Sequence, residues 1–339
     1  MVRNIKYLLL SVIITYSMPV FTQQDSLLKE ISNIDISLNA PPDSSEDLYL
    51  NTVSFQSFYD ILSPMGEWIQ IPKGDIKDDL NDGSGQGYSS LYNPAEDEEL
   101  LFIWRPAGVS SDWRPYTYGR WEFTDRGWLW VSAESWGWTT CHYGRWWHSG
   151  NFGWVWLPGY VWAPSWVRWR VTDDHIGWVP LSPKAQWNIE TGITEVNYRY
   201  KNNDADWVFV QKTNFVNDLN SSSVINPGMN SSLIAKSTKI TNIKAENDMV
   251  VNNGPDVKDI EKRTGKTIQK KSVNFTREHG SPQIGENSIT VYKGDFKKNL
   301  VDKTGKPIVT DKPQKYVHAR KIIKKRIQPR RPRRIIRRK

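Results

Sequence analysis

The distribution of tryptophan constrains this chain more than any other feature of its sequence. Sixteen of its 18 tryptophans fall within the 84 residues from Trp104 to Trp187. Charged residues make up 24% of the chain and its mean hydropathy is −0.60, values that fit neither a membrane bundle nor a Leu-rich helical protein. The length would allow roughly two domains, but a single Trp-rich core with extended polar flanks uses the same residues. The composition therefore favours one compact aromatic-rich module.

An internal repeat organises these tryptophans. The segments 113–121 and 138–146 share Trp, Tyr, Gly, Arg and Trp at a constant offset of 25 residues. Downstream, Gly127-Trp-Leu-Trp130 recurs as Gly153-Trp-Val-Trp156 at an offset of 26, so the intervening turn differs in length by one residue. A third, degenerate copy follows at residues 162–180. Polar turn residues divide each copy into two halves, which predicts three β-hairpins.

Strand periodicity assigns side chains to the faces of these hairpins. Trp121 shares one face of its strand with Phe123, and Trp128 shares one face of the returning strand with Trp130. We therefore expect an all-β core in which the hairpins pair as one six-stranded antiparallel meander. A curled or barrel-like sheet would shield the edges of such a meander best.

An arginine stands before the last tryptophan in two copies of the repeat. Arg120 and Arg145 should point away from that neighbouring ring, where each could stack on an aromatic side chain of the next strand.

The segments around the repeat suggest further elements. A short helix is expected at residues 54–62, with its apolar residues on one face, followed by strands at 66–71 and 99–104. The acidic, Gly-rich stretch 73–98 between those strands is predicted to be a solvated loop. We place the Trp-rich β domain at residues 54–220, a polar and loosely structured extension at 221–311 with a short helix at 256–263, and a disordered tail at 312–339.

The N-terminus has the features of an export signal. Arg3 and Lys6 precede an apolar run from Tyr7 to Ser17, which is too short to span a bilayer comfortably. We assign residues 1–22 to a signal peptide and 23–53 to a linker. An uncleaved anchor is the alternative, because the cleavage site lacks the usual Ala-x-Ala pattern.

The basic charge of the chain is confined to its tail. Residues 312–339 contain fourteen Lys or Arg and no acid; removing these from the total of 45 leaves 31 basic against 37 acidic residues, so residues 1–311 carry a net charge of −6. Such a tail can bind a polyanion through counterion release or serve only as a solvated flank. The candidate polyanion-binding residues are Lys324, Lys325, Arg326, Arg330, Arg331, Arg333, Arg334, Arg337 and Arg338.

The repeat motifs resemble a known family. Tyr-Gly-Arg-Trp121, Gly127-Trp-Leu-Trp130, His142-Tyr-Gly-Arg-Trp146 and the further Trp motifs up to Leu181 are similar to an uncharacterised family of exported, Trp-rich bacterial proteins, some of which occur beside FecR-type envelope domains. The resemblance covers roughly residues 55–183, and the motif at residues 253–265 looks like the weaker C-terminal part of that family. The loop at 73–98 looks like an insertion. The resemblance implies an envelope location and a β fold, but no activity or catalytic residue.

The abundance of indole rings suggests ligand stacking, because indole faces bind the C–H faces of sugars and stack on nucleobases. A few large rings would already fill a core of this size, so most should be structural. We expect Trp121, Trp146, Trp154 and Trp156 to be core residues. The candidate ligand-stacking residues are rings near Pro or Gly in predicted loops, and they are Trp113, Trp147, Trp162 and Trp166.

No catalytic, cofactor-binding or metal-binding residue is predicted. Cys141 and the nearby histidines lack the spacing of a metal motif, and we expect the histidines to form structural hydrogen bonds. Asp173, Asp174 and His175 offer acid and base groups, but no nucleophile motif accompanies them.

These observations favour a non-enzymatic binding or scaffolding protein of the bacterial periplasm or cell envelope, with the tail contacting a polyanion or glycan. One alternative is an envelope glycan hydrolase whose carboxylates are not located. Another is a purely structural partner of a second envelope protein. Export makes nucleic acid a less suitable ligand for the tail.

Overall fold

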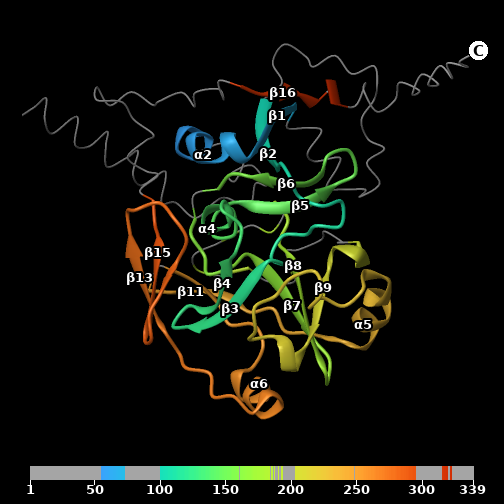
Figure 1. Cartoon of the computed structure of the whole chain (residues 1–339), viewed down its shortest axis with the longest axis vertical. Helices are drawn as coiled ribbons and strands as arrows, with labels where there is room; N and C mark the ends of the chain where they lie inside the picture. Colours follow the sequence, from blue (N-terminus) through green and yellow to red (C-terminus); the bar gives the residue numbers. More distant parts are fainter. Residues whose placement is uncertain are drawn as a thin grey trace, which may run out of the picture. The chain divides into compact units, whose positions relative to one another are not determined.

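The computed structural model describes residues 55–72, 100–159, 161–183, 203–247, 249–294 and 315–319, together with single positions at 185, 187, 190, 192, 193, 321 and 322. All of them belong to the unit Glu46–Lys339. Within them, strands form four sheets and the helices are short (Figure 1). The predicted all-β core is confirmed. None of the described helices is long and apolar enough to cross a membrane.

The N-terminal elements form where the sequence indicated. Helix α2 (Phe55–Leu62) runs into a short 3-10 turn η1 (Ser63–Met65), and Pro64 lies within that turn. Strand β1 (Gly66–Pro72) then pairs antiparallel with β2 (Leu100–Pro106) along its whole length. Phe58 is fully buried and its ring lies 5.2 Å from that of Trp156, so α2 covers part of the Trp-rich core. The predicted loop 73–98 and Ser54, the first residue of the predicted helix, lie outside the described residues.

All three predicted hairpins are present. They are β3 (Gly119–Thr124) with β4 (Gly127–Ser132), β5 (Arg145–Ser149) with β6 (Gly153–Leu157), and β7 (Val167–Val171) with β8 (His175–Pro180). In each one, two tryptophans are directly opposite across the ladder: Trp121 and Trp130, Trp146 and Trp156, Trp169 and Trp178. Such cross-strand aromatic pairs stabilise a hairpin.

Turn length accounts for the change of offset between the first two copies. The closing pair is Thr124 and Gly127 in the first hairpin, but Ser149 and Gly153 in the second, so the second loop holds one more residue. Gly127 and Gly153 both have positive φ, at 81° and 75°, which glycine adopts without steric cost.

The expectation of a single six-stranded meander was wrong. Each hairpin belongs to a different sheet: β5 and β6 extend β1 and β2, β7 and β8 lie between β10 and β9, and β3 and β4 join β11 and β12. No sheet in the described part of the chain closes into a barrel. The physical reason lies in burial, because β4, β6 and β8 are buried at nearly every position and so need cover on both faces. A one-sided meander cannot supply that cover.

The tryptophans form one interlocking core. Trp121 lies at its centre, with its ring centroid 4.9 Å from Trp130, 4.6 Å from Trp169 and 5.5 Å from Trp178. The four rings predicted to be structural are all buried: Trp121, Trp146, Trp154 and Trp156. Trp121 also has Phe215 within 6.1 Å, which draws a residue beyond the repeat into the same cluster.

Many of the indole N–H groups donate to backbone carbonyls distant in sequence. Trp104 donates to the Leu62 carbonyl oxygen at 3.1 Å, and Trp178 donates to that of Tyr116 at 3.0 Å. These bonds satisfy a buried donor and fix a loop at the same time. The remaining bonds of this kind join Trp128 to Pro255, Trp146 to Thr140, Trp156 to Tyr143 and Trp166 to His142.

The stacking expected of the repeat arginines occurs once. The Arg145 guanidinium carbon lies 3.5 Å from the Trp166 ring centroid, and the side chain is fully buried. Arg120 instead forms ion pairs with Glu122 at 2.9 Å and Asp218 at 3.3 Å. An acidic neighbour therefore replaces the aromatic partner at the first copy.

The segment predicted to be strand around Trp138 is helical instead. Helix α4 (Gly137–Thr140) follows Trp136, and Cys141 and His142 belong to the turn that succeeds it. The strand begins only at Arg145, so the first half of the second repeat copy differs in conformation from the pattern that its sequence suggested.

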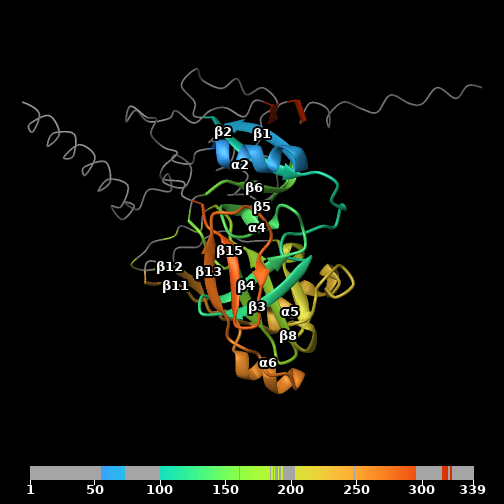
Figure 2. The same ribbon diagram turned by 60° about the vertical axis from the view of Figure 1, so that its left-hand side comes forward.

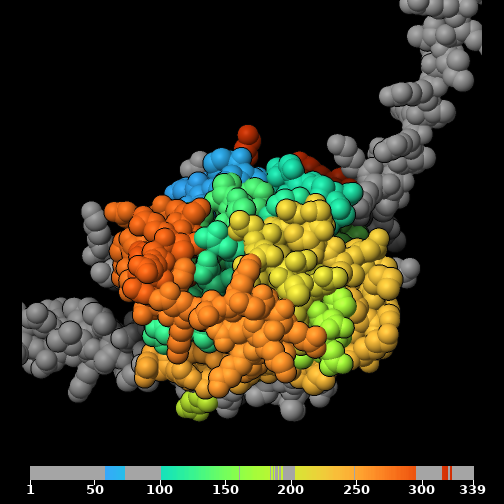
Figure 3. All heavy atoms as spheres, turned by 60° about the horizontal axis from the view of Figure 1, so that its bottom comes forward, coloured from blue at the N-terminus to red at the C-terminus, as the bar shows by residue number. Residues whose placement is uncertain are grey.

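Residues 203–294 continue the regular structure. Those up to residue 220 belong to the predicted β domain and hold the elements η3 (Asp204–Asp206), β9 (Val208–Gln211) and η4 (Lys212–Asn214). Those from residue 221 contain more helices and strands than the loosely structured extension that we expected there: η5 (Pro227–Met229), α5 (Asn230–Lys236), β10 (Thr238–Lys239), β11 (Ile243–Glu246), β12 (Met249–Asn252), α6 (Val257–Thr264), β13 (Ser272–Thr276), β14 (Gln283–Ile284) and β15 (Ser288–Tyr292). In Figure 3 these yellow to orange residues cover much of one face of the molecule. A few buried apolar residues and many polar contacts to the repeat hold them, and composition does not reveal such contacts.

Asn252 shows how the C-terminal part joins the repeat. Its side chain is fully buried; Oδ1 accepts from the Trp169 indole at 2.8 Å, while Nδ2 donates to the Val167 carbonyl at 3.1 Å and to both oxygens of Ser165. Gly254 follows with a φ of 58°, and a Cβ at this position would meet the rings of Trp128 and Trp169 within 3 Å. The predicted short helix is confirmed as α6, where Asp256 caps the N-terminus and Gly265 ends the helix.

Replacing Asn252 with Ala should destabilise the fold by about 2–4 kcal/mol, because the change leaves a buried indole N–H and two buried carbonyls without the hydrogen-bond partner that Asn252 provides. The measurement is the free energy of unfolding in urea. Asn274→Ala, at an exposed position of β13, is the matched control and should stay within about 0.5 kcal/mol of the unaltered protein. Equal stabilities of the two variants would contradict this account of Asn252.

Candidate functional site

A surface pocket of about 280 Å³ lies between two loops. Residues 110–118 belong to the loop that connects β2 to β3, and residues 221–226 precede η5, which begins at Pro227. Its lining mixes aromatic, charged and hydroxyl groups: Ser110, Asp112, Trp113, Arg114, Thr117, Tyr118, Ser221, Val224, Ile225, Asn226 and Pro227. The volume suits a small ligand rather than a macromolecule.

Tyr116 fixes the first loop although it does not line the pocket. Its φ is 61°, a left-handed conformation that is uncommon for a residue with a Cβ. Three hydrogen bonds hold it there: its hydroxyl donates to the Cys141 carbonyl at 2.8 Å and accepts from the Trp166 amide, and its carbonyl accepts from the Trp178 indole at 3.0 Å. The core thus determines the shape of this pocket wall.

Trp113 forms the inner aromatic wall and is held from behind by a carboxyl group. Its indole N–H donates to Oε1 of Glu134, and the Ser132 hydroxyl donates to Oε2 at 3.2 Å. Burial raises the pKa of Glu134 to about 7, and the two hydrogen bonds only partly offset this effect. Glu134 does not itself line the pocket.

Two charged residues border the pocket. Asp112 is exposed, and a hydrogen bond from the Ser110 side chain lowers the pKa of its carboxyl group, which is therefore an ionised acceptor. Arg114 donates through Nη1 to the carbonyls of Trp207 at 2.6 Å and Ala205 at 3.1 Å, and burial lowers its pKa. Burial also disfavours the charged form of neighbouring Asp206, and it raises the pKa of that carboxyl group to about 7.

Tyr118 supplies the outer aromatic surface. It is one of the few large apolar side chains that are exposed, at 37%, and its hydroxyl lies 3.4 Å from the Ser221 hydroxyl across the pocket. Oδ1 of Asn226 accepts a hydrogen bond from the Gly228 amide, and this bond orients the Asn226 side chain in the second loop. The pocket therefore offers two aromatic side chains together with hydroxyl, amide and carboxylate groups that can bind a hydroxylated ring.

The structure brings one of the four predicted ligand-stacking residues to this site. Trp113 lines the pocket, although only 7% of its surface is exposed. The expected exposure was wrong for all four, because Trp113 is buried like the others. Trp147 is buried in the core, Trp166 lies beneath the Arg145 guanidinium, and Trp162 is enclosed between His142 and Phe275. Trp147 lies within strand β5, whereas Trp162 and Trp166 lie outside the strands and are nevertheless buried.

The predicted structural histidines make polar or aromatic contacts. His142 is buried, its Nδ1 lies 2.8 Å from the Ala163 carbonyl oxygen, and burial lowers its pKa to about 4. The rings of His148 and Trp154 lie 5.5 Å apart. No group of three or more His, Cys, Asp or Glu suited to a metal ion occurs among the described residues.

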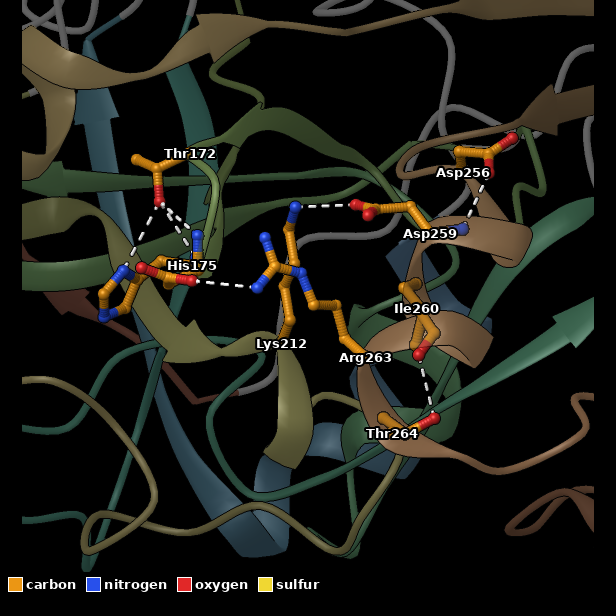
Figure 4. A network of polar contacts seen from close by, with 9 residues as sticks. Thr172, His175, Lys212, Asp256, Asp259, Ile260, Arg263 and Thr264 are labelled. Carbon is orange, nitrogen blue, oxygen red and sulfur yellow. Dashed lines mark hydrogen bonds and ion pairs between the residues drawn. The ribbon is translucent and has the colours of Figure 1, made fainter.

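Asp174 and His175, at the turn after β7, belong to a network that docks α6 (Figure 4). Asp174 forms an ion pair with Arg263 at 3.2 Å, and the His175 ring nitrogen Nδ1 lies 3.4 Å from the Thr172 hydroxyl. Beside them, the buried Lys212 ammonium lies 2.6 Å from a carboxylate oxygen of Asp259. These contacts hold α6 in place, and they give Asp174 and His175 partners other than a substrate.

The nine candidate polyanion-binding residues between Lys324 and Arg338 lie outside the described residues. The short strand β16 (Val317–His318) precedes them in the chain, and it pairs in parallel with β1, opposite Ile69 and Gln70. Ala319 is buried against the same sheet. The prediction of disorder from residue 312 onward was therefore wrong for residues 317–319, which are held at a sheet edge.

Sequence reasoning missed most of the pocket. Tyr118 occupies the same repeat position as Tyr143, yet Tyr143 is buried and Tyr118 is exposed, and the motif alone does not separate them. Ser221 was assigned to a loose linker because serines surround it. Only Trp113 carried a signal, since it stands in a loop with Arg and Pro after it.

These features define a Trp-rich β module with one polar-aromatic pocket described above. Residues 90–185 match the model of a family of unknown function, DUF6600, which covers the three hairpins. The match agrees with the uncharacterised family that the motifs suggested. The association with FecR-type domains remains a prediction. Neither the curated proteins nor the solved structures gave a match.

The pKa of Glu134 predicts a pH dependence of stability. Because burial raises it from an ordinary value near 4.5 to about 7, the folded state holds a proton that the unfolded state releases. Its stabilising effect is present in full below about pH 4.5 and is lost as the pH rises through 7. Between pH 5 and 8, the unaltered protein should therefore lose on the order of 1–3 kcal/mol more stability than Glu134→Gln.

Urea unfolding at both pH values tests this prediction. Asp206 titrates in the same range but is present in both proteins, so the difference between them isolates Glu134. Asp173→Asn, at an exposed turn position, is the control and should keep the pH profile of the unaltered protein. Identical profiles for Glu134→Gln and the unaltered protein would contradict the prediction.

Proposed function

We propose that this protein is a non-enzymatic glycan-binding module of the bacterial cell envelope. The observation that carries the proposal is the pocket in which Trp113 and Tyr118 accompany Asp112, Ser221 and Asn226. Aromatic rings pack on the C–H faces of sugar rings, while hydroxyl, amide and carboxylate groups bind sugar hydroxyls. The ligand would be a short segment of a glycan, because the cavity measures about 280 Å³.

The charges of the pocket favour a neutral or amino-bearing sugar at this position. Asp112 stays ionised at neutral pH and accepts hydrogen bonds, and it would repel an anionic ring. Arg114 also lines the pocket, but its Nη1 already donates to two backbone carbonyls. The pocket is thus better suited to binding hydroxyl or ammonium groups than to neutralising a carboxylate.

The envelope location rests on the sequence. Arg3, Lys6 and the apolar run that follows them resemble an export signal, and export would place the protein where glycans and polyanions are abundant. In this proposal the basic residues between Lys324 and Arg338 contact a polyanion and keep the module near its glycan. Because an exported protein meets little nucleic acid, nucleic acid is a less suitable ligand for these basic residues.

A hydrolase is the competing function, because Asp112 and Glu134 have pKa values shifted in opposite directions, a pattern found in acid–base pairs. We favour binding without catalysis because Glu134 lies behind Trp113 and Ser132 rather than in the pocket lining. Release of reducing ends from an envelope glycan, abolished by Asp112→Asn, would overturn the proposal.

Tyr118→Ala should weaken glycan binding about five- to tenfold, as expected when a stacked ring worth about 1 kcal/mol is removed. A glycan array with the full-length chain identifies the ligand, and calorimetry then measures the dissociation constant. Asp112→Asn should also weaken binding. Met229→Ala is the control, because Met229 is 56% exposed but does not line the pocket.

A chain truncated after Ile322 separates the tail from the pocket. This variant keeps β16 and removes all nine candidate basic residues, so it should bind the glycan with unchanged affinity and lose retention on anionic polymers. Capture of a protein partner with no glycan signal would favour the structural-partner alternative. Equal glycan affinities of Tyr118→Ala and Met229→Ala would exclude this pocket as the binding site.

A further inference from the structure

The surface next to the pocket is built by two segments that run side by side. Gly119, at the start of β3, forms an antiparallel bridge with Leu219 and makes both of its hydrogen bonds, at 3.1 and 2.7 Å. Figure 2 shows β3 beside β4, so the segment around Leu219 lies along the other edge of β3. Tyr118 and Ser221, which line the pocket, stand at one end of the two segments. Both segments therefore lead away from the pocket in the same direction.

The bridge determines which side chains face outward along these segments. Gly119 and Leu219 are both buried, so the residues on either side of them point to the opposite face, as alternation along an extended chain requires. In the antiparallel register, Arg120 lies opposite Asp218. The four outward-facing residues are Tyr118, Arg120, Asp218 and Asn220.

Arg120 and Asp218 form an ion pair immediately beyond Tyr118. Nη1 of Arg120 donates to Oδ1 of Asp218 at 3.3 Å, and Nε donates to a carboxylate oxygen of Glu122 at 2.9 Å. The Lys271 ammonium lies 3.2 Å from the other oxygen of Glu122. The side chain of Asp218 is 82% exposed and that of Arg120 is 36% exposed, so both can contact a ligand. The pair presents N–H donors and a carboxylate acceptor in a fixed orientation.

Asn220 adds an amide group between this ion pair and the pocket. Its Oδ1 accepts from the Ser222 amide at 2.9 Å and from the Ser222 hydroxyl at 2.6 Å. These bonds orient the side chain and, within the described part of the chain, leave Nδ2 able to donate to a ligand. From the pocket outward, the surface thus offers an aromatic ring, an amide and an ion pair.

The charges along this surface cancel. Arg120 and Lys271 are balanced by Asp218 and Glu122, so the surface does not attract a polyanion. Tyr118 is the one large apolar side chain exposed along it, which is too little apolar area for a protein partner. A guanidinium beside a carboxylate offers donors and acceptors that match adjacent hydroxyl groups. A neutral sugar is therefore the ligand that this surface fits.

We propose that Arg120, Asp218 and Asn220 form a second sugar subsite, so that the ligand of the pocket is a linear glycan rather than a single sugar. Residues two apart on an extended strand are separated by about 7 Å, which places Arg120 roughly one sugar beyond Tyr118. Tyr118 then borders both subsites. This inference rests on the proposed function of the pocket, and it adds the minimum length of the ligand and the residues that select for it.

The test measures how the affinity of the full-length chain, labelled with ¹⁵N, depends on the length of the glycan. The probes are glucose, mannose and N-acetylglucosamine, each as the single sugar and as its unbranched chains of two and three units. In a series that binds, the two-unit chain should bind about tenfold more tightly than the single sugar, because it gains the hydrogen bonds of the ion pair. The backbone amide resonances of Arg120 and Asp218 should shift with the two-unit chain but not with the single sugar.

Arg120→Gln and Asp218→Asn should each reduce the gain from the second sugar about fivefold and leave the affinity for the single sugar unchanged. Both variants should stay folded, because an exposed ion pair contributes little to stability. Arg105→Gln is the matched control. Arg105 forms an ion pair with Glu67, its side chain is 34% exposed, and it does not line the pocket. This variant should bind every probe as the unaltered protein does.

The failure of this inference differs from the failure of the proposed function. Equal affinities for the single sugar and its longer chains would exclude a second subsite and leave the pocket in place. A gain with length that Arg120→Gln and Asp218→Asn both retain would put the second sugar on other residues, and this too would overturn the inference. Absence of binding by all three series would overturn the proposed function and the second subsite with it. The dispersion of the same spectra reports whether each variant is folded.

Discussion

Hydrogen bonds from buried indole N–H groups to distant acceptors connect the parts of this fold, although the donors of Trp121 and Trp130 are buried without an acceptor. A tryptophan gains much from burial, but its N–H donor costs free energy in an apolar interior unless an acceptor lies in reach. In this chain the acceptors are largely backbone carbonyls of other segments, such as Leu62 for Trp104 and Pro255 for Trp128. Each of these bonds ties a loop to the core. The density of tryptophan therefore gives this small β module a network of fixed connections as well as apolar volume.

That network explains why the pocket is shaped by the core. The loop at residues 110–118 contains a left-handed residue, Tyr116, whose conformation is maintained by Trp166, Trp178 and Cys141. Trp113 is likewise held by Glu134 from behind. A binding surface on such a loop is ordered before any ligand arrives, which reduces the entropy lost on binding.

The sequence was sufficient to predict the local pairing but not the larger arrangement. Period-two alternation and turn residues located the hairpins, and even the opposition of Trp121 and Trp130 follows from them. How the hairpins combine depends on contacts such as those of Asn252, which lie about 85 residues away in the chain and leave no periodic signal. The sequence also does not reveal which side chains are exposed, because Tyr118 and Tyr143 share a motif although only Tyr118 is exposed. The pocket, built from two loops, had to be found in three dimensions.

The separation of the hairpins into different sheets has a consequence for the modularity of the repeat. The copies are alike in sequence, but each has acquired different neighbours, so they cannot be exchanged, deleted or added as units of a solenoid can. The family match ends at residue 185, whereas acceptors for Trp169 and Trp128 come from Asn252 and Pro255. A relative that shares only the matched segment must supply those two acceptors from some other part of its chain, replace the two rings, or leave their donors without an acceptor, as those of Trp121 and Trp130 are here.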